Sequence, residues 1–175
     1  MMTGLVGVAL LSGGTVAFFS DSKDTDNKIL SGTLDLDVSD NDDGVLFEFY
    51  NKKPGDTFDY SFDLINAGTL DMKDVTLYSD HEILNRKGAK DNNGFDKQIK
   101  VMKIQVDGKN VLDEAITLET LKKQPILLAD SITTETAAVQ VYVEFEFVRT
   151  ENDQNEYQGN TLDLQWTFEA VQEDE

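Results

Sequence analysis

The sequence predicts a mainly β protein that folds as an antiparallel β-sandwich. In most of its apolar segments hydrophobic residues alternate with polar ones, which is the period of a half-buried strand. Turn-forming residues separate roughly seven or eight such segments at short intervals, and the sequence contains one short helical pattern. The 175 residues, 39% of them hydrophobic, show no internal repeat and no linker, so they supply the core of one domain.

The strand patterning is clearest towards the C-terminus. Residues 139–147 alternate Val and Phe with polar residues, and residues 162–168 alternate Leu, Trp and Phe in the same way. The segments that carry strand patterning are residues 34–38, 45–50, 58–64, 75–77, 100–106, 139–147 and 162–168. Seven segments of this kind favour two packed sheets.

Turn signals separate these segments. Lys53-Pro54-Gly55-Asp56 predicts a tight turn, because Pro fixes φ and Gly relieves steric conflict. Asn66-Ala67-Gly68-Thr69 ends the strand predicted over residues 58–64. Asp107-Gly108 predicts a hairpin leading into residues 110–112. Two longer polar stretches, residues 85–98 and 150–160, are predicted to be loops.

One helix is predicted, over residues 117–123 (TLETLKK). Thr117 can cap its first turn, although Thr120 stands where a capping box would have Glu. Pro125 ends the helical pattern.

The net charge of −19 is spread along the whole chain. Such a surface is soluble and self-repelling, and it disfavours binding to nucleic acid or to an anionic membrane. It can also collect cations, which leaves weak binding of divalent ions open. Because the sequence has no cysteine, disulfides and thiolate metal sites are excluded.

The first 17 residues are uncharged and contain a short apolar run, residues 5–11. We interpret residues 1–17 as a signal peptide cut between Ala17 and Phe18, since small residues precede the cut and the apolar run is too short to span a membrane. The basic stretch that usually opens a signal peptide is absent, so a buried N-terminal segment is the alternative. After cleavage we expect no membrane span.

The predicted mature chain starts with a segment that differs from the rest. Residues 18–32 have apolar side chains only near their two ends, at Phe18, Phe19, Ile29 and Leu30. Such a segment buries little surface by itself, so it is predicted to be an N-terminal arm or a weakly held edge strand. Residues 33–175 form the predicted sandwich domain.

No catalytic residue is predicted. A zinc peptidase of the common kind needs two His four residues apart on a helix with a Glu between them, and the chain has one histidine, His81. We interpret His81 as a surface residue in a loop. Serine and cysteine catalysis lack support, because no Ser stands in a G-x-S-x-G context and cysteine is absent.

Two acidic patterns are interpreted as solvated surface. Residues 40–44 (DNDDG) resemble the start of a calcium loop, but Gly44 comes too early, so an acidic turn is the preferred interpretation and weak calcium binding the alternative. Glu144 and Glu146 alternate with core residues of a predicted strand, which places them on its solvent face rather than in an acid–base pair.

Four segments resemble the TasA/camelysin (CalY) family of secreted bacterial fibre proteins, and the camelysin branch more closely. They are GGTVAFFSD, SGTLDLDV, KKPGDTFDYSFDLINAGTLDMKDVTL and DQNEYQGNTLDLQWTFEA, whereas residues 80–135 match no pattern of the family. The resemblance implies a jelly-roll sandwich that is exported through a signal peptide, which a dedicated signal peptidase cuts, and that polymerises head to tail into extracellular matrix or cell-surface fibres. It also implies donor-strand addition, in which the arm of one subunit joins the sheet of the next.

We therefore expect a secreted structural subunit that binds copies of itself and other matrix components and that has no cofactor. The residues expected to anchor the donated arm are Phe18, Phe19, Ile29 and Leu30. Two alternatives stay open: a cell-surface metallopeptidase of camelysin type, and a surface adhesin or accessory protein that does not polymerise.

Overall fold

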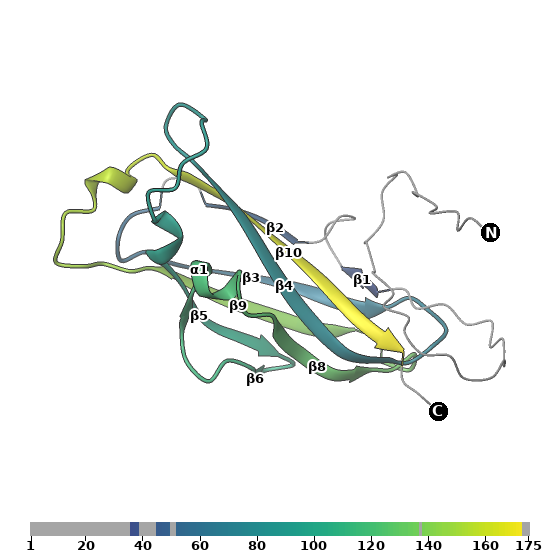
Figure 1. Cartoon of the computed structure of the whole chain (residues 1–175). Helices are drawn as coiled ribbons and strands as arrows, with labels where there is room; N and C mark the ends of the chain where they lie inside the picture. The colour runs from purple at the N-terminus through teal and green to yellow at the C-terminus, as the bar shows by residue number, and fades with distance from the viewer. Residues whose placement is uncertain (1–35, 39–44, 50–51, 137, 173–175) are drawn as a thin grey trace, which may run out of the picture.

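A computed structural model describes residues 36–38, 45–49, 52–136 and 138–172. They form two antiparallel β-sheets packed face to face, which confirms the predicted sandwich (Figure 1). The predicted signal peptide, the predicted arm and the acidic segment 40–44 lie outside the described residues.

The structure has ten strands in its described part, together with one α-helical turn and two short 3-10 helices. The strands are β1 (Leu36–Val38), β2 (Val45–Phe49), β3 (Thr57–Asn66), β4 (Met72–Leu84), β5 (Ile99–Val106), β6 (Lys109–Asn110), β7 (Ile116–Thr117), β8 (Ile126–Ile132), β9 (Val139–Phe147) and β10 (Thr161–Gln172). The helices are η1 (Phe95–Lys97), α1 (Leu118–Leu121) and η2 (Asn155–Tyr157).

The topology is that of a jelly roll. One sheet has the order β2-β10-β4-β8, and the other has the order β1-β3-β9-β5-β6, with β7 also paired to β5. The pairs β2·β10, β3·β9, β4·β8 and β5·β6 are nested, so the chain forms one long hairpin whose two arms are rolled together into two sheets. β1 adds to the free edge of β3 outside this hairpin.

Strand register defines two ends of the sandwich. Leu36 lies opposite Asn66, and Met72 lies opposite Gln172, at what we call the β1 end. Thr57 lies opposite Glu146 and Leu84 opposite Thr161 at the other end, the α1 end, where η1 and α1 also lie (Figure 1).

The core fills the space between the sheets with alternate residues of each strand. β9 buries Val139, Val141, Val143, Phe145 and Phe147, and its burial pattern alternates as predicted. β10 contributes its own buried set, Leu162, Leu164, Trp166 and Phe168. The ring of Phe47 packs edge to face on Trp166 at 5.0 Å and on Phe145 at 5.6 Å, which joins the two sheets.

The predicted turns are confirmed by their backbone geometry. The Asp56 N–H donates to the Lys53 carbonyl at 2.9 Å across a turn in which Gly55 has φ 95°, a value that favours glycine. Asp107 and Gly108 both have positive φ, 48° and 79°, as a two-residue type I′ hairpin between β5 and β6 requires.

The helix and the first long loop differ from the prediction. Thr117 caps α1 by accepting the Thr120 N–H at 3.2 Å, but α1 ends at Leu121, before Lys122 and Lys123. The stretch 85–98 is not wholly loop, because η1 forms within it and buries Phe95, whose ring packs edge to face on Phe147 at 5.3 Å. One apolar residue in a polar stretch therefore fixes this segment to the core.

Candidate functional site

The residues predicted to carry assembly lie outside the part of the chain that the structure describes. These residues are Ala17 and Phe18 at the signal cut, and Phe18, Phe19, Ile29 and Leu30 in the arm. Their roles stay predictions. The described residues show the strand edges of the sandwich and the polar groups that lie beside them.

The prediction for His81 is wrong. His81 lies on strand β4, and its side chain faces inward with 5% exposure rather than standing in a surface loop. The prediction ended this strand at Leu77, although the inward alternation continues through Ser79, His81 and Ile83. Polar residues at two successive inward positions concealed the second half of the strand from the hydrophobic pattern.

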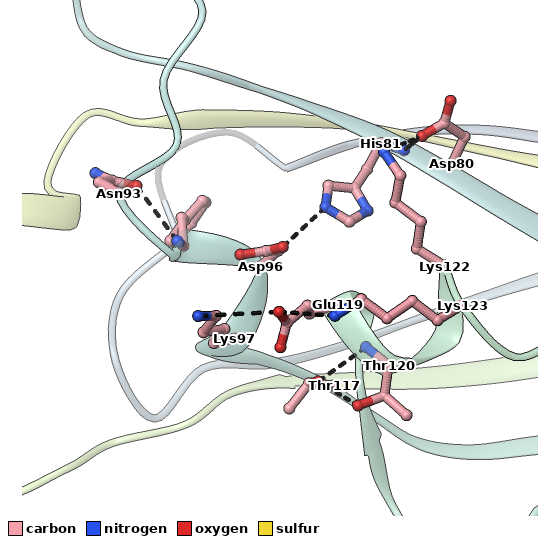
Figure 2. A network of polar contacts seen from close by, with 11 residues as sticks. Asp80, His81, Asn93, Asp96, Lys97, Thr117, Glu119, Thr120, Lys122 and Lys123 are labelled. Atoms are coloured by element: carbon pink, nitrogen blue, oxygen red, sulfur yellow. Dashed lines mark hydrogen bonds and ion pairs between the residues drawn. The ribbon is translucent and has the colours of Figure 1, made fainter.

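His81 forms a buried pair with Asp96 of η1. Its Nε2 atom lies 3.2 Å from Asp96 Oδ2, and the Asp96 side chain is 16% exposed (Figure 2). The Nδ1 atom of His81 is buried and has no hydrogen-bond partner among the described residues. This contact fixes the loop after β4 against the inward face of the strand.

Ion pairs extend this contact to α1. The Lys122 ammonium lies 2.5 Å from Asp80 Oδ1, and Glu119 Oε1 receives Lys123 at 2.9 Å and Lys97 at 3.9 Å (Figure 2). We call Asp80, His81, Asp96, Lys97, Glu119, Lys122 and Lys123 the charged clasp. It joins β4, η1 and α1 at the α1 end of the sandwich.

The clasp borders a polar cavity of about 810 Å³. Its lining residues are Asp80, His81, Glu82, Ile83, Lys90, Asp91, Asn92, Gly94, Asp96, Lys97, Glu119, Lys122, Lys123, Asp163 and Gln165. The volume is within the range of ligand pockets, but the lysines around it already face carboxylates, as Lys90 does with Glu82. Most of the local charge is therefore satisfied within the chain.

These pairs shift carboxyl pKa values downwards. The Lys122 hydrogen bond lowers the pKa of Asp80, assisted by the backbone N–H of His81 and opposed by partial burial. The Lys123 hydrogen bond lowers the pKa of Glu119 in the same way. On the outer face of the other sheet, Lys103 lowers the pKa of Glu144, and the two side chains lie 2.9 Å apart. Glu144 is therefore a surface ion-pair partner, in keeping with its predicted position.

The described residues do not fit a catalytic zinc. A catalytic site holds the metal with three protein ligands, and no three His, Asp or Glu side chains come together in this way within the described ranges. The Nε2 atom of His81 already faces Asp96, and the chain has no second histidine.

Among the described residues, two inner strands extend past the strands paired with them at the α1 end. The described part of β1 pairs with β3 at residues 64–66, and we call residues 57–63 of β3 the β3 overhang. β8 pairs with β4 at residues 72–77 only, which leaves residues 78–84 as the β4 overhang. A projecting strand edge is where another strand can add.

The β4 overhang is closed by its own chain. The Asp80 carboxylate accepts the His81 backbone N–H at 2.8 Å, and the Ile83 carbonyl accepts the Asp91 N–H at 2.9 Å. The charged clasp then crosses this edge. Satisfied backbone groups and charged side chains are the usual protection of an edge against strand addition.

The β3 overhang is aromatic. Phe58 and Tyr60 face inward yet stay partly exposed, and the ring of Phe58 stacks on Phe145 at 5.4 Å. The Phe49 ring, from the edge strand of the opposite sheet, lies 4.8 Å from Phe58, while Lys52 Nζ lies 4.4 Å from the centre of the Phe58 ring. β2, β3 and β9 therefore each contribute an aromatic ring to this corner of the sandwich.

Comparison with known proteins identifies the family. The model of the camelysin metallo-endopeptidase family matches residues 1–175. The chain belongs to the camelysin family. It is also 29% identical, over 95% of its length and 83% of the relative's, to the major biofilm matrix component of Bacillus subtilis (strain 168). The family resemblance inferred from the sequence is thereby confirmed.

Within the described ranges, no helix has the length and apolar character needed to cross a membrane.

Proposed function

We propose that this camelysin-family protein is a secreted structural subunit that polymerises into extracellular matrix or cell-surface fibres by donor-strand addition. The observation that carries the proposal is the similarity, over 95% of the chain, to a protein named as a major biofilm matrix component. The sandwich is compatible with this proposal, since among the described residues β3 and β4 extend past the strands paired with them. An added strand satisfies backbone groups at such an edge and fills its groove with alternate side chains.

The proposed donor is the arm, residues 18–32, with Phe18, Phe19, Ile29 and Leu30 as anchors. Removal of residues 1–17 by signal peptidase would free the new N-terminus at Phe18 and start assembly. A head-to-tail contact of this kind does not close on itself, so it produces a filament. Secretion, the cut after Ala17 and the fibre itself are parts of this proposal.

The test compares two purified proteins by negative-stain electron microscopy, one starting at Phe18 and one starting at Gly32. We expect fibres from the first and monomers from the second, because only the first carries the donor arm. Monomers from both would reject self-assembly and favour the hypothesis of a surface adhesin or accessory protein that does not polymerise. Fibres from both would reject the arm as the donor.

The family's description as a metallo-endopeptidase supports a second candidate, a cell-surface peptidase. The described residues argue against zinc at His81, as shown above. A casein digest with and without a chelator tests this candidate, with the His81→Gln variant as control. The peptidase function would be established if the wild type cleaved casein, the chelator stopped this cleavage, and the His81→Gln variant did not cleave.

A further inference from the structure

The loop that contains η1 holds the single Asn-Gly pair of the sequence, Asn93-Gly94, directly before the helix. We propose that this pair is a site of spontaneous modification. Asn93 loses its side-chain amide to water through a cyclic imide, and the change loosens the η1 loop from β4. This chemistry is independent of fibre assembly.

The reaction needs no reagent other than water. The backbone nitrogen of Gly94 loses its proton and attacks Cγ of Asn93, so that a C–N bond forms and the Cγ–Nδ2 bond breaks. Nδ2 leaves as ammonia, and a cyclic imide remains. Water then opens the imide at one of its two carbonyl carbons. The product is aspartate when the backbone bond to Gly94 is kept, and isoaspartate when the chain continues through Cγ instead.

Neither the attacking nitrogen nor the leaving nitrogen is held in place. Among the described residues, the Gly94 N–H donates no hydrogen bond, and Asn93 Nδ2 donates none either. Gly94 has no side chain to hinder the attack, and its φ of 82° is a value that favours glycine. Apart from chain neighbours, the atom nearest to a Cβ built at Gly94 would be Lys97 Cδ at 3.7 Å, so the space beside Gly94 is open.

A backbone donor polarises the carbonyl group that is attacked. The Phe95 N–H donates to Asn93 Oδ1 at 3.3 Å (Figure 2). Phe95 is 2% exposed and its ring packs on Phe147, so the core fixes the position of this N–H. Negative charge grows on Oδ1 when the Gly94 nitrogen attacks, and a fixed donor at that oxygen stabilises it. The core contact of η1 therefore activates the amide.

Two other asparagines show what protects a side-chain amide. Asn66 is 8% exposed, and its Nδ2 donates to the carbonyls of Leu70 at 2.9 Å and Ile132 at 3.0 Å, which holds the leaving group. Asn110 Nδ2 likewise donates to the Leu112 carbonyl at 2.7 Å. Each of these asparagines also precedes a residue with a Cβ, which hinders attack by the backbone nitrogen.

The modification falls between two contacts that hold the loop on β4. The Asp91 N–H donates to the Ile83 carbonyl at 2.9 Å, and Asp96 Oδ2 lies 3.2 Å from His81 Nε2. Either product places a new carboxylate between Asp91 and Asp96, where like charges repel. Isoaspartate also lengthens the main chain by one methylene group between the two contacts. Both changes disfavour the closed position of the loop.

Peptide mass spectrometry of the full chain tests the site without any substitution. The folded protein is kept in mildly alkaline buffer, and the loss of amide is followed at Asn93, Asn66 and Asn110 in the same digests. We expect Asn93 to change at least ~10-fold faster than either of the others. A synthetic peptide of residues 90–97 gives the rate without the fold, and the folded chain should match or exceed it. Amide loss at Asn93 that is no faster than at Asn66, or slower than in the peptide, would overturn the assignment.

Hydrogen exchange tests the effect on the loop. Protein in which most of Asn93 has changed is compared with fresh protein and with Asn93→Asp, which has the charge but not the extra methylene group. We expect the Asp91 amide to exchange ~10-fold faster in the aged protein, with a smaller increase in the variant. Gly94→Ala is the matched control, because a Cβ on the attacking residue slows ring closure, and its exchange should be the same before and after ageing. Unchanged exchange of the Asp91 amide in aged wild type would overturn the loosening of the loop.

Discussion

The two overhangs at the α1 end have the same origin but different surroundings. Among the described residues, each is an inner strand that extends past the strand paired with it, β3 past β1 and β4 past β8. At β4 two of the three inward positions, Ser79 and His81, are polar, and the loop containing η1 closes the edge through Asp91 and Asp96. At β3 the three inward positions are aromatic: Phe62 is buried, whereas Phe58 and Tyr60 stay partly exposed.

This difference shows that an open strand edge alone does not identify a binding site. β4 uses charged and polar groups to close its own edge: Asp80 pairs with Lys122 and with the His81 N–H, and His81 Nε2 pairs with Asp96. At β3, part of the aromatic surface of Phe58 and Tyr60 stays exposed, and burial of such surface is favourable. The predictions below test the two corners, starting with the largest expected effect.

The aromatic cluster beneath the β3 overhang should dominate local stability. Phe145 is fully buried, and its ring contacts include Phe47, Phe58 and Trp166. We expect Phe145→Ala to lower the free energy of unfolding by about 3–5 kcal/mol, because it leaves a cavity between the sheets. Urea unfolding followed by Trp fluorescence measures this loss.

Phe145→Leu is the matched control, since it keeps most of the volume and should cost less than ~1.5 kcal/mol. Equal losses for the two variants would mean that the ring contacts matter more than the volume they fill. A loss below ~1 kcal/mol for Phe145→Ala would show that this corner is packed more loosely than the structure has it.

The buried pair of the β4 corner should have the next largest effect. Asp96→Ala removes the partner of His81 Nε2 and leaves a buried polar atom unsatisfied. We expect a loss of about 1–3 kcal/mol in unfolding free energy, measured by urea denaturation. The exposed residue Glu114 gives the control, and Glu114→Ala should stay within about 0.5 kcal/mol of wild type. If the two variants match, His81–Asp96 does not hold η1 on β4.

The sequence predicted the β3 corner better than the β4 corner for a physical reason. Phe58, Tyr60, Phe62 and Leu64 alternate with polar residues, and this period of two identifies a strand without any tertiary information. Pro54 and Gly55 likewise fix their turn locally. The sandwich and its clearest strands were therefore predictable.

The β4 corner depends on contacts between residues far apart in the chain. Ser79 and His81 interrupt the hydrophobic alternation, so the second half of β4 could not be recognised. Asp96, which pairs with His81, lies 15 residues later in the chain, and Lys122, which pairs with Asp80, follows α1 still further along. Pairings of this kind have no local sequence signal, which is why His81 was assigned to the surface.

The exposed part of the clasp should have the smallest effect, and that effect should depend on pH. Lys122 lowers the pKa of Asp80 below its ordinary value of 3.8, so the pair stabilises the fold above that value. The stabilisation is lost as the pH falls through the lowered pKa of the folded state, because the carboxyl then becomes neutral. Asp80 is largely exposed, so Asp80→Asn should cost less than ~1 kcal/mol at pH 7.

The measurement is the difference in urea midpoint between wild type and Asp80→Asn, taken at pH 7 and again near pH 3. We expect a small difference in urea midpoint at pH 7 and a smaller one near pH 3. At pH 7, 0.5 M salt should also reduce the difference, because it screens the ion pair. Lys122→Met in the same series should reproduce the gap at pH 7. A gap at pH 7 that Lys122→Met does not reproduce would mean that Asp80 acts on the β4 edge through its bond to the His81 N–H and not through Lys122.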